Sequence, residues 1–373
     1  MKNALWRLAS NRLNSMVFIN ERIKSQQNSP AVTPPLSRFV FKPEALAEHL
    51  RKTIRGQNQV IDHIESQLKV VHTGLSDPRR PLLTALFIGA TGVGKTEMVR
   101  QIAQAIHGRS DAFCRIDMNT LSQSHYSAAI TGAPPGYVGS KENLSLLNED
   151  LIKGTASRPG IVLFDEIEKA DHSVVLTLMN ILDNGTLKLA SGQKTIQFTN
   201  TLVFMTSNLG SRTAEALPWL DAIPGVSRRS IYRRALERHF KPEFLNRIGI
   251  VEYFSALRFN DLPNLVENLE HLLNQQLKRH NISLELEPNA RDLIVQFSDY
   301  KKYGARAIER TFRDLVVTDL ATLISRTKDL SAGTHYHGIV QDRHLEFLPV
   351  SVPRNRSNLT PKSPKATEGA NHD

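Results

Sequence analysis

The segment from Gly89 to Thr96 restricts the fold more strongly than any other part of the chain. It reads Gly-Ala-Thr-Gly-Val-Gly-Lys-Thr and fits the pattern G-x-x-x-x-G-K-[ST]. A short apolar run at 82–88 precedes it, and a segment with helical character at 95–107 follows. Backbone N–H groups and a helix N-terminus arranged in this order surround a phosphate group. The pattern therefore predicts an α/β domain with a nucleotide site.

Two carboxylates follow a second apolar run. Residues 161–164 read Ile-Val-Leu-Phe and end at Asp165 and Glu166. In a site of this kind, Lys95 reaches the β- and γ-phosphates, and Thr96 and Asp165 bind Mg²⁺. Glu166 then polarises the attacking water. Each motif also has a purely structural alternative. Residues 89–96 could form a glycine-rich turn with a surface lysine, and Asp165 and Glu166 could be two acids at the solvated start of a helix.

Alternating strands and helices surround these motifs. The expected strands are 82–88, 113–117, 161–165 and 201–206, and the expected helices begin at 43 and 59 and span 95–107, 143–153 and 173–183. This alternation predicts a mainly parallel sheet. After about residue 255, expected helices at 261–281, 289–297 and 304–326 and strands at 282–287 and 344–348 form a smaller α+β unit.

Composition excludes several classes of protein. Hydrophobic residues make up 40% and charged residues 23% of the 373 residues, as in ordinary globular proteins. No segment approaches the roughly 18 apolar residues that a membrane-spanning helix requires. Cys114 is the single cysteine, so no intramolecular disulfide can form. The thirteen histidines are scattered, with His335 and His337 the closest pair, and no zinc-type spacing is evident. The net charge of +10 favours polyanionic partners without choosing among them.

Both ends of the chain differ from the middle. The first twenty residues are basic and free of acids, and they could form either a mitochondrial transit peptide or a short helical arm. Residues 25–38 are rich in Gln, Ser and Pro and read as a linker. The basic segment from 350 to 373 is expected to be disordered.

With its motifs taken in order, the chain resembles Clp-type AAA+ ATPases, and most closely the second ATPase module of ClpB and ClpA unfoldases. The motifs that carry this resemblance are Arg55-Gly56-Gln57, the phosphate loop, Gly132–Gly139 (Gly-Ala-Pro-Pro-Gly-Tyr-Val-Gly), Asp165–Ala170, Thr206–Gly210, Phe244–Ile248 and Gly304-Ala305-Arg306. The resemblance implies an N-terminal arm and linker at 1–42, a large ATPase domain at 43–254, a small lid domain at 255–349 and a tail at 350–373. Arg55 departs from the family, whose members often have an aliphatic residue near the adenine at this position.

The resemblance also implies roles for individual residues. ATP would be bound by Ile54, Arg55, Gly89, Thr91, Gly92, Val93, Gly94, Lys95, Thr96, Glu97 and Asp165, with Mg²⁺ on Thr96 and Asp165. The residues implied in catalysis are Glu166, Asn208, the arginine finger Arg247 and the sensor Arg306. A loop containing Gly136, Tyr137 and Val138 would grip the polypeptide substrate. Without the motif set, Arg247 and Arg306 would be ordinary surface cations, Asn208 a turn residue and Tyr137 a core residue.

An ATP-dependent protein unfoldase, or disaggregase-like remodelling chaperone, is therefore expected. It would thread polypeptides through a ring of identical subunits, for which a hexamer is expected. One alternative is an unfoldase subunit that feeds a peptidase, but residues 222–226 do not match a peptidase-docking loop, which disfavours it. The other alternative is a motor acting on DNA, and its main support is an arginine-rich segment at 228–234. An adaptor could bind the N-terminal arm, and no membrane partner is expected. The expected location is the cytoplasm, or the mitochondrial matrix if 1–38 is a transit peptide.

Overall fold

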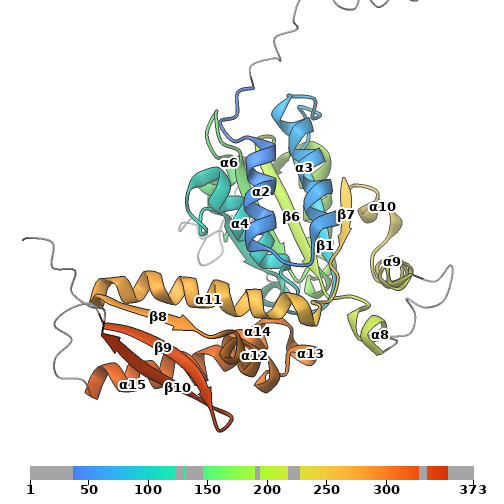
Figure 1. Cartoon of the computed structure of the whole chain (residues 1–373). Helices are drawn as coiled ribbons and strands as arrows, with labels where there is room; N and C mark the ends of the chain where they lie inside the picture. The colour runs from blue at the N-terminus through green and yellow to red at the C-terminus, as the bar shows by residue number, and fades with distance from the viewer. Residues whose placement is uncertain are drawn as a thin grey trace, which may run out of the picture.

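The computed structural model describes residues 37–122, 130, 146–189, 194–216, 227–326 and 334–351. The greater part of the predicted arm, the loop with Gly136, Tyr137 and Val138, residues 222–226 and the tail beyond 351 lie outside the described residues. An α/β domain and a smaller α+β domain follow each other along the chain (Figure 1). The smaller domain lies beside the edge of the sheet where β1 ends (Figure 1).

The α/β domain is built on a five-stranded sheet in which every described pair of neighbours is parallel. In spatial order the strands are β2 (Cys114–Asp117), β3 (Gly160–Asp165), β6 (Thr201–Ser207), β1 (Leu83–Ile88) and β7 (Ile250–Tyr253). All residues of β1, β3 and β6 are buried. Strands covered on both faces explain why these segments are continuously apolar rather than alternating.

Helices cover both faces of this sheet. One side carries α2 (Pro43–Thr53), α3 (Asn58–His72) and α4 (Lys95–His107), which pack with Ala85 and Phe87 of β1. The other side carries α6 (Glu149–Lys153), α7 (His172–Asn184), α9 (Arg228–His239) and α10 (Pro242–Leu245), which pack with Leu86 and Ile88. The two-residue period of a strand divides β1 between these two hydrophobic cores. Short elements complete the domain: the 3₁₀ turns η1 (Met118–Leu121) and η3 (Ile167–Lys169), the hairpin strands β4 (Thr186–Lys188) and β5 (Thr195–Gln197), and α8 (Ser211–Ala216).

The small domain combines a mixed sheet with a group of helices. Strand β9 (Thr334–Gln341) lies between β8 (Ile282–Leu286), to which it is parallel, and β10 (His344–Ser351), to which it is antiparallel. The helices are α11 (Leu262–Leu277), α12 (Pro288–Phe297), α13 (Tyr300–Tyr303), α14 (Ala305–Phe312) and α15 (Thr318–Arg326), with 3₁₀ turns η5 (Phe259–Asp261) and η6 (Lys278–His280). Leu284, Ile308 and Tyr336 belong to its separate hydrophobic core.

Most predicted strands and helices of the large domain are confirmed within a residue or two, but the helix expected at 143–153 is wrong over part of its length. Residues 146–148 are not helical, and α6 begins only at Glu149. The side chain of Asn148 accepts a hydrogen bond from the Leu151 N–H at 3.2 Å and so caps the helix at this point. Residues 143–145 lie outside the described part of the chain.

The expected long helices of the small domain are both interrupted. The helix predicted at 261–281 ends at Leu277 and continues as the 3₁₀ turn η6. The helix predicted at 304–326 begins after Gly304 and contains a π-helical turn at Arg313–Val317, which separates α14 from α15. Strands β4, β5, β7 and β9 were not predicted. Among the described helices, none has the combined length and apolar character required to span a bilayer.

Candidate functional site

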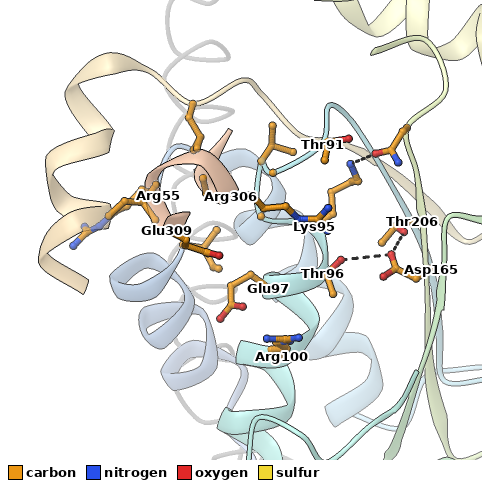
Figure 2. A pocket seen from close by; sticks show the side chains of 18 of the residues that line it. Arg55, Thr91, Lys95, Thr96, Glu97, Arg100, Asp165, Thr206, Arg306 and Glu309 are labelled. Carbon is orange, nitrogen blue, oxygen red and sulfur yellow. Dashed lines mark hydrogen bonds between the residues drawn. The ribbon is translucent and has the colours of Figure 1, made fainter. Parts of the chain in front are cut away.

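A cavity of about 460 Å³ lies at the carboxyl ends of the central strands, where the two domains meet. Strands β1, β3 and β6 are neighbours, so the segments that follow them come together at one edge of the sheet. The α/β domain contributes residues from 91 to 97, together with Asp165, Thr206 and Asn208. The small domain contributes Leu257, Leu265, Ala305, Arg306 and Glu309. Figure 2 shows charged side chains of both domains around this cavity.

Lys95 is the most enclosed cation of the cavity among the described residues. Its side chain is on the first residue of α4, and the residue is only 7% exposed. Its Nζ donates hydrogen bonds to the carbonyl oxygens of Gly89 (2.7 Å) and Ala90 (2.6 Å) and to Oδ1 of Asn208 (2.8 Å). Burial lowers the pKa of Lys95 from 10.5 to about 8, although nearby carboxylates act in the opposite direction. The ammonium therefore lies inside the loop at the N-terminus of α4, where an anion is favoured.

The loop touches the small domain directly at Gly92. Gly92 has a φ of +78°, and a Cβ at this position would lie 2.4 Å from the carbonyl oxygen of Tyr303. The N–H of Ala305 donates a hydrogen bond to the Gly92 carbonyl at 3.0 Å. A side chain at Gly92 would thus push the small domain away from the loop. This contact makes the position of α14 sensitive to the conformation of the loop.

Asp165 lies at the end of β3 and is surrounded by donors. The guanidinium of Arg115, from β2, donates to Oδ2 from Nε (3.0 Å) and from a terminal nitrogen (2.6 Å). The hydroxyl of Thr206 donates to Oδ1, and the hydroxyl of Thr96 lies 3.5 Å from the same oxygen (Figure 2). Asp165 is 5% exposed, and these partners offset the cost of burying its charge.

The oxygens around Asp165 fit a magnesium ion. Mg²⁺ prefers hard oxygen ligands and is commonly bound by one or two protein groups together with phosphate oxygens. The Thr96 hydroxyl and the Asp165 carboxylate provide two such oxygens on neighbouring elements, next to the phosphate-type loop. A cation at this position would replace the charge that Arg115 supplies to Asp165 in this structure.

Glu166 adopts a backbone conformation that is uncommon for its residue type. Its φ of 57° and ψ of 53° lie in the left-handed region, which costs a non-glycine residue about 1–2 kcal/mol. Its N–H donates to the Thr206 hydroxyl at 2.9 Å, which helps to hold this turn. One carboxylate oxygen accepts a hydrogen bond from Nδ2 of Asn119 at 2.6 Å, and the other lies 3.4 Å from Nδ2 of Asn208. The turn directs the carboxylate toward the cavity rather than along the strand.

Charged groups of both signs meet on the side of the cavity formed by α4 and α14. Arg306 and Glu309 come from α14, and Glu97 and Arg100 come from α4 (Figure 2). Burial raises the pKa of Glu309, and the nearby Glu97 carboxylate raises it further, whereas the nearby arginines lower it. The charges of the two domains are thus electrostatically coupled across the cavity.

The cavity brings together most of the residues that the sequence pointed to. Those that line it are Ile54, Arg55, Thr91, Gly92, Val93, Gly94, Lys95, Thr96, Glu97, Asp165, Glu166, Asn208 and Arg306. Gly89 does not line it, but its carbonyl oxygen accepts a hydrogen bond from Lys95. Arg247 does not line it, because its guanidinium donates to Asp183 of α7 and to the Glu243 carbonyl. Gly136, Tyr137 and Val138 lie outside the described residues.

Sequence reasoning missed several residues of the site. Arg115 precedes Asp117 by two positions on β2, and Asp117 pairs with Asp165 in the sheet register. Only that register could have indicated the contact with Asp165. Asn119 and Glu309 could not be predicted either, because they come from elements far away in sequence. Asn119 contacts Glu166, and Glu309 lines the cavity. Gln57, which is 2% exposed, was recognised only as part of a motif. Its side chain joins the carbonyls of Val93 and Ser255 at 3.3 and 2.9 Å and so braces the loop.

Comparisons with known proteins agree with this two-domain arrangement. A family model described as "AAA domain (Cdc48 subfamily)" matches residues 80–251, and one described as "C-terminal, D2-small domain, of ClpB protein" matches residues 257–337. The chain is 47% identical over 297 residues to the "ATP-dependent protease ATP-binding subunit-like protein AmiB" of Pseudomonas aeruginosa, with 76% of this chain and 80% of that protein covered. An "ATP-dependent protease ATP-binding subunit-like protein" of Rhodococcus erythropolis is 39% identical over 82% of this chain and 91% of its own length. "Chaperone protein ClpB 1" of Synechococcus elongatus is 34% identical over 83% of this chain, which spans only 34% of that chaperone.

Proposed function

The chain belongs to the Clp-type AAA+ ATPases, and we propose that it uses ATP hydrolysis to unfold and remodel other proteins. One observation carries the proposal furthest. Side chains of the phosphate loop and of the small domain line one cavity, and the two domains are joined there by the hydrogen bond from Ala305 to Gly92. Cleavage of the nucleotide in such a cavity changes the contacts between the domains. Hydrolysis can thereby produce movement.

Different residues of the cavity have different roles in ATP hydrolysis. Lys95 and the N–H groups of its loop would bind the phosphates. Thr96 and Asp165 would hold Mg²⁺, and the ion would supply positive charge to the phosphates. Glu166 accepts a proton from the attacking water, and Asn208, which lies between Lys95 and Glu166, positions that water. Arg306 contacts the γ-phosphate from the small domain and senses the nucleotide. Ile54, Leu257 and Leu265 supply apolar surface for the base.

Arg247 acts on the nucleotide of a neighbouring subunit in this proposal. Its guanidinium lies outside the cavity of its own chain and pairs with Asp183, whose other oxygen lies 3.7 Å from Arg80. The side chain is 28% exposed, which leaves it within reach of a second subunit. A guanidinium at the neighbour's γ-phosphate stabilises charge that develops during transfer. Assembly into a ring, expected to be a hexamer, is needed for this role.

Tyr137 is the residue proposed to grip the substrate. Its segment, Gly136-Tyr137-Val138-Gly139, follows two prolines and favours an exposed loop. An aromatic ring offers a large contact area and can press on any polypeptide. Movement of such loops in a ring would thread the substrate through the centre, as disaggregation requires.

The test measures ATP hydrolysis and protein unfolding separately. Tyr137→Ala should keep the basal ATPase rate and lose most unfolding of a tagged protein, while Tyr137→Phe, which keeps the ring, should retain both. Circular dichroism and assembly measurements check that both variants fold. Unchanged unfolding by Tyr137→Ala would contradict threading. Stronger stimulation of the ATPase by DNA than by unfolded protein would favour a motor acting on nucleic acid.

A second candidate function is delivery of substrates to a peptidase. Two similar proteins, from Pseudomonas aeruginosa and Rhodococcus erythropolis, carry names that describe an ATP-binding subunit of a protease. The fate of a tagged substrate distinguishes the two functions when the chain is combined with a compartmental peptidase from its own source. Release of intact polypeptide supports remodelling alone, whereas ATP-dependent appearance of peptides supports a protease subunit.

A further inference from the structure

Two strands of the small domain bring together three metal-binding side chains that are distant in sequence. Strands β8 and β9 are parallel, and their register pairs Ser283 with His335 and Glu285 with His337. The intervening residues Leu284 and Tyr336 are buried in the core of the domain, so these four polar residues lie on the opposite face. The histidine pair noticed in the sequence thereby acquires a carboxylate about fifty positions away.

The distances among these side chains fit a bound metal ion. Nε2 of His337 and Nε2 of His335 lie 3.2 and 3.5 Å from the same oxygen, Oε2 of Glu285. One potential ligand atom from each of the three residues lies within 4.8 Å of those of the other two. Zinc bonds of about 2.0–2.2 Å in a tetrahedral arrangement place two ligand atoms about 3.3 Å apart. The shortest contact of each imidazole with Glu285 is thus to the same carboxylate oxygen.

A neighbouring hydroxyl holds one of the rings in position. Ser283 Oγ lies 2.7 Å from Nδ1 of His335, on the side of the ring away from Glu285. The two imidazole rings are 5.0 Å apart and nearly perpendicular, at 72°. A group that orients a histidine through its second nitrogen is a usual companion of a metal ligand. A simple surface ion pair between a histidine and Glu285 would not need this second contact.

We propose that Glu285, His335 and His337 bind a divalent transition-metal ion, with Zn²⁺ the best match, and that water completes the coordination. Two imidazoles and a carboxylate are suitable ligands for zinc and are poorly suited to Mg²⁺ or Ca²⁺, which prefer oxygen. The ion would join β8 to β9 and so stabilise the sheet of the small domain. None of the three residues lines the nucleotide cavity, so this site is separate from the one that holds Mg²⁺.

The test is zinc binding to the full chain in excess Mg²⁺, measured by equilibrium dialysis, with Co²⁺ absorption as a report on geometry. Wild type should bind one zinc ion per chain, and Glu285→Gln and His337→Gln should each weaken binding at least about tenfold. Ser283→Ala should weaken it about tenfold as well. His344→Gln, which removes an exposed imidazole from β10 of the same sheet, should bind as wild type does.

Two further measurements keep the result interpretable. Asp165→Asn should leave zinc binding unchanged, because Asp165 belongs to the nucleotide cavity. Zinc should raise the melting temperature of wild type but not that of Glu285→Gln. Equal zinc binding by wild type and His337→Gln, or a Co²⁺ spectrum identical to that of the free hydrated ion, would overturn the proposal. Loss of the site in Asp165→Asn alone would assign the ion to the nucleotide cavity instead.

Discussion

Raising the pH from about 7 to about 9 should weaken ATP binding about tenfold through Lys95 alone. The Nζ of Lys95 is enclosed by two carbonyl oxygens and Asn208 Oδ1, and burial lowers its pKa from 10.5 to about 8. The difference corresponds to about 3 kcal/mol of bias against the ammonium form. Bound phosphates offset this bias, because their negative charge favours the ammonium.

The direction of the effect follows from the protons bound in each state. Below pH 8 the free site already carries the ammonium, so ATP affinity should be nearly independent of pH. Above pH 8 the free site loses its proton and must regain it when ATP binds, so affinity should fall about tenfold per pH unit. Folding without nucleotide shows the opposite trend. The unfolded chain binds more protons between pH 8 and 10.5, so Lys95 contributes rising stability with pH over that interval.

A fluorescent ATP analogue can measure this affinity across the range, and calorimetry in buffers of different ionisation heat can count the protons taken up. Burial has the largest effect on the pKa of Lys95, whereas the carboxylates of Glu168, Asp165 and Glu166 raise that pKa and the Arg306 guanidinium lowers it. Lys95→Arg is the matched control, because any binding it retains should not change over these pH values. An affinity for wild type that stays constant up to about pH 10 would refute the reasoning.

Three other predictions concern individual side chains. Glu166→Gln should bind ATP and lose nearly all turnover, and near-normal hydrolysis would remove Glu166 from the chemistry. Arg247→Ala should bind ATP without hydrolysing it, and mixing it with Lys95→Ala subunits should restore some turnover; mixed rings without recovery would argue against action between subunits. Arg115→Gln should lower the Mg²⁺ concentration needed for nucleotide binding severalfold, because Arg115 competes for Asp165 (2.6 Å). An unchanged or higher Mg²⁺ requirement in titrations would contradict that competition.

The part of the site that is local in sequence could be predicted, because a strand, a glycine-rich loop and a helix are specified by adjacent residues. Lys95, Thr96 and Asp165 were found in this way. Arg115 was not, since its contact depends on how the edge strand β2 aligns with β3. The same limitation concealed the group formed by Glu285 and His337, which only the register of β8 and β9 reveals.

The fold could be predicted to about the same extent as the site. The buried strands β1, β3 and β6 are continuous apolar runs and were recognised easily. Strand β9 reads Thr-His-Tyr-His-Gly-Ile-Val-Gln, with polar residues on its outer face and a glycine in the middle, so its pattern was too weak to identify. Helix α6 was predicted too long, because the cap supplied by Asn148 was not recognised.

Several charged groups of the cavity have hydrogen-bond partners within the protein, and this affects how the site must work. Lys95 donates to its own loop and to Asn208, Asp165 accepts from Arg115, and Glu166 accepts from Asn119 at 2.6 Å. Binding of ATP and Mg²⁺ therefore exchanges one set of partners for another, and the net affinity is a difference between two large terms. Each carboxylate oxygen of Glu166 can accept more than one hydrogen bond, so Asn119 orients this carboxylate without blocking it as a proton acceptor. The position of η1, which carries Asn119, therefore influences how the carboxylate of the proposed general base is oriented.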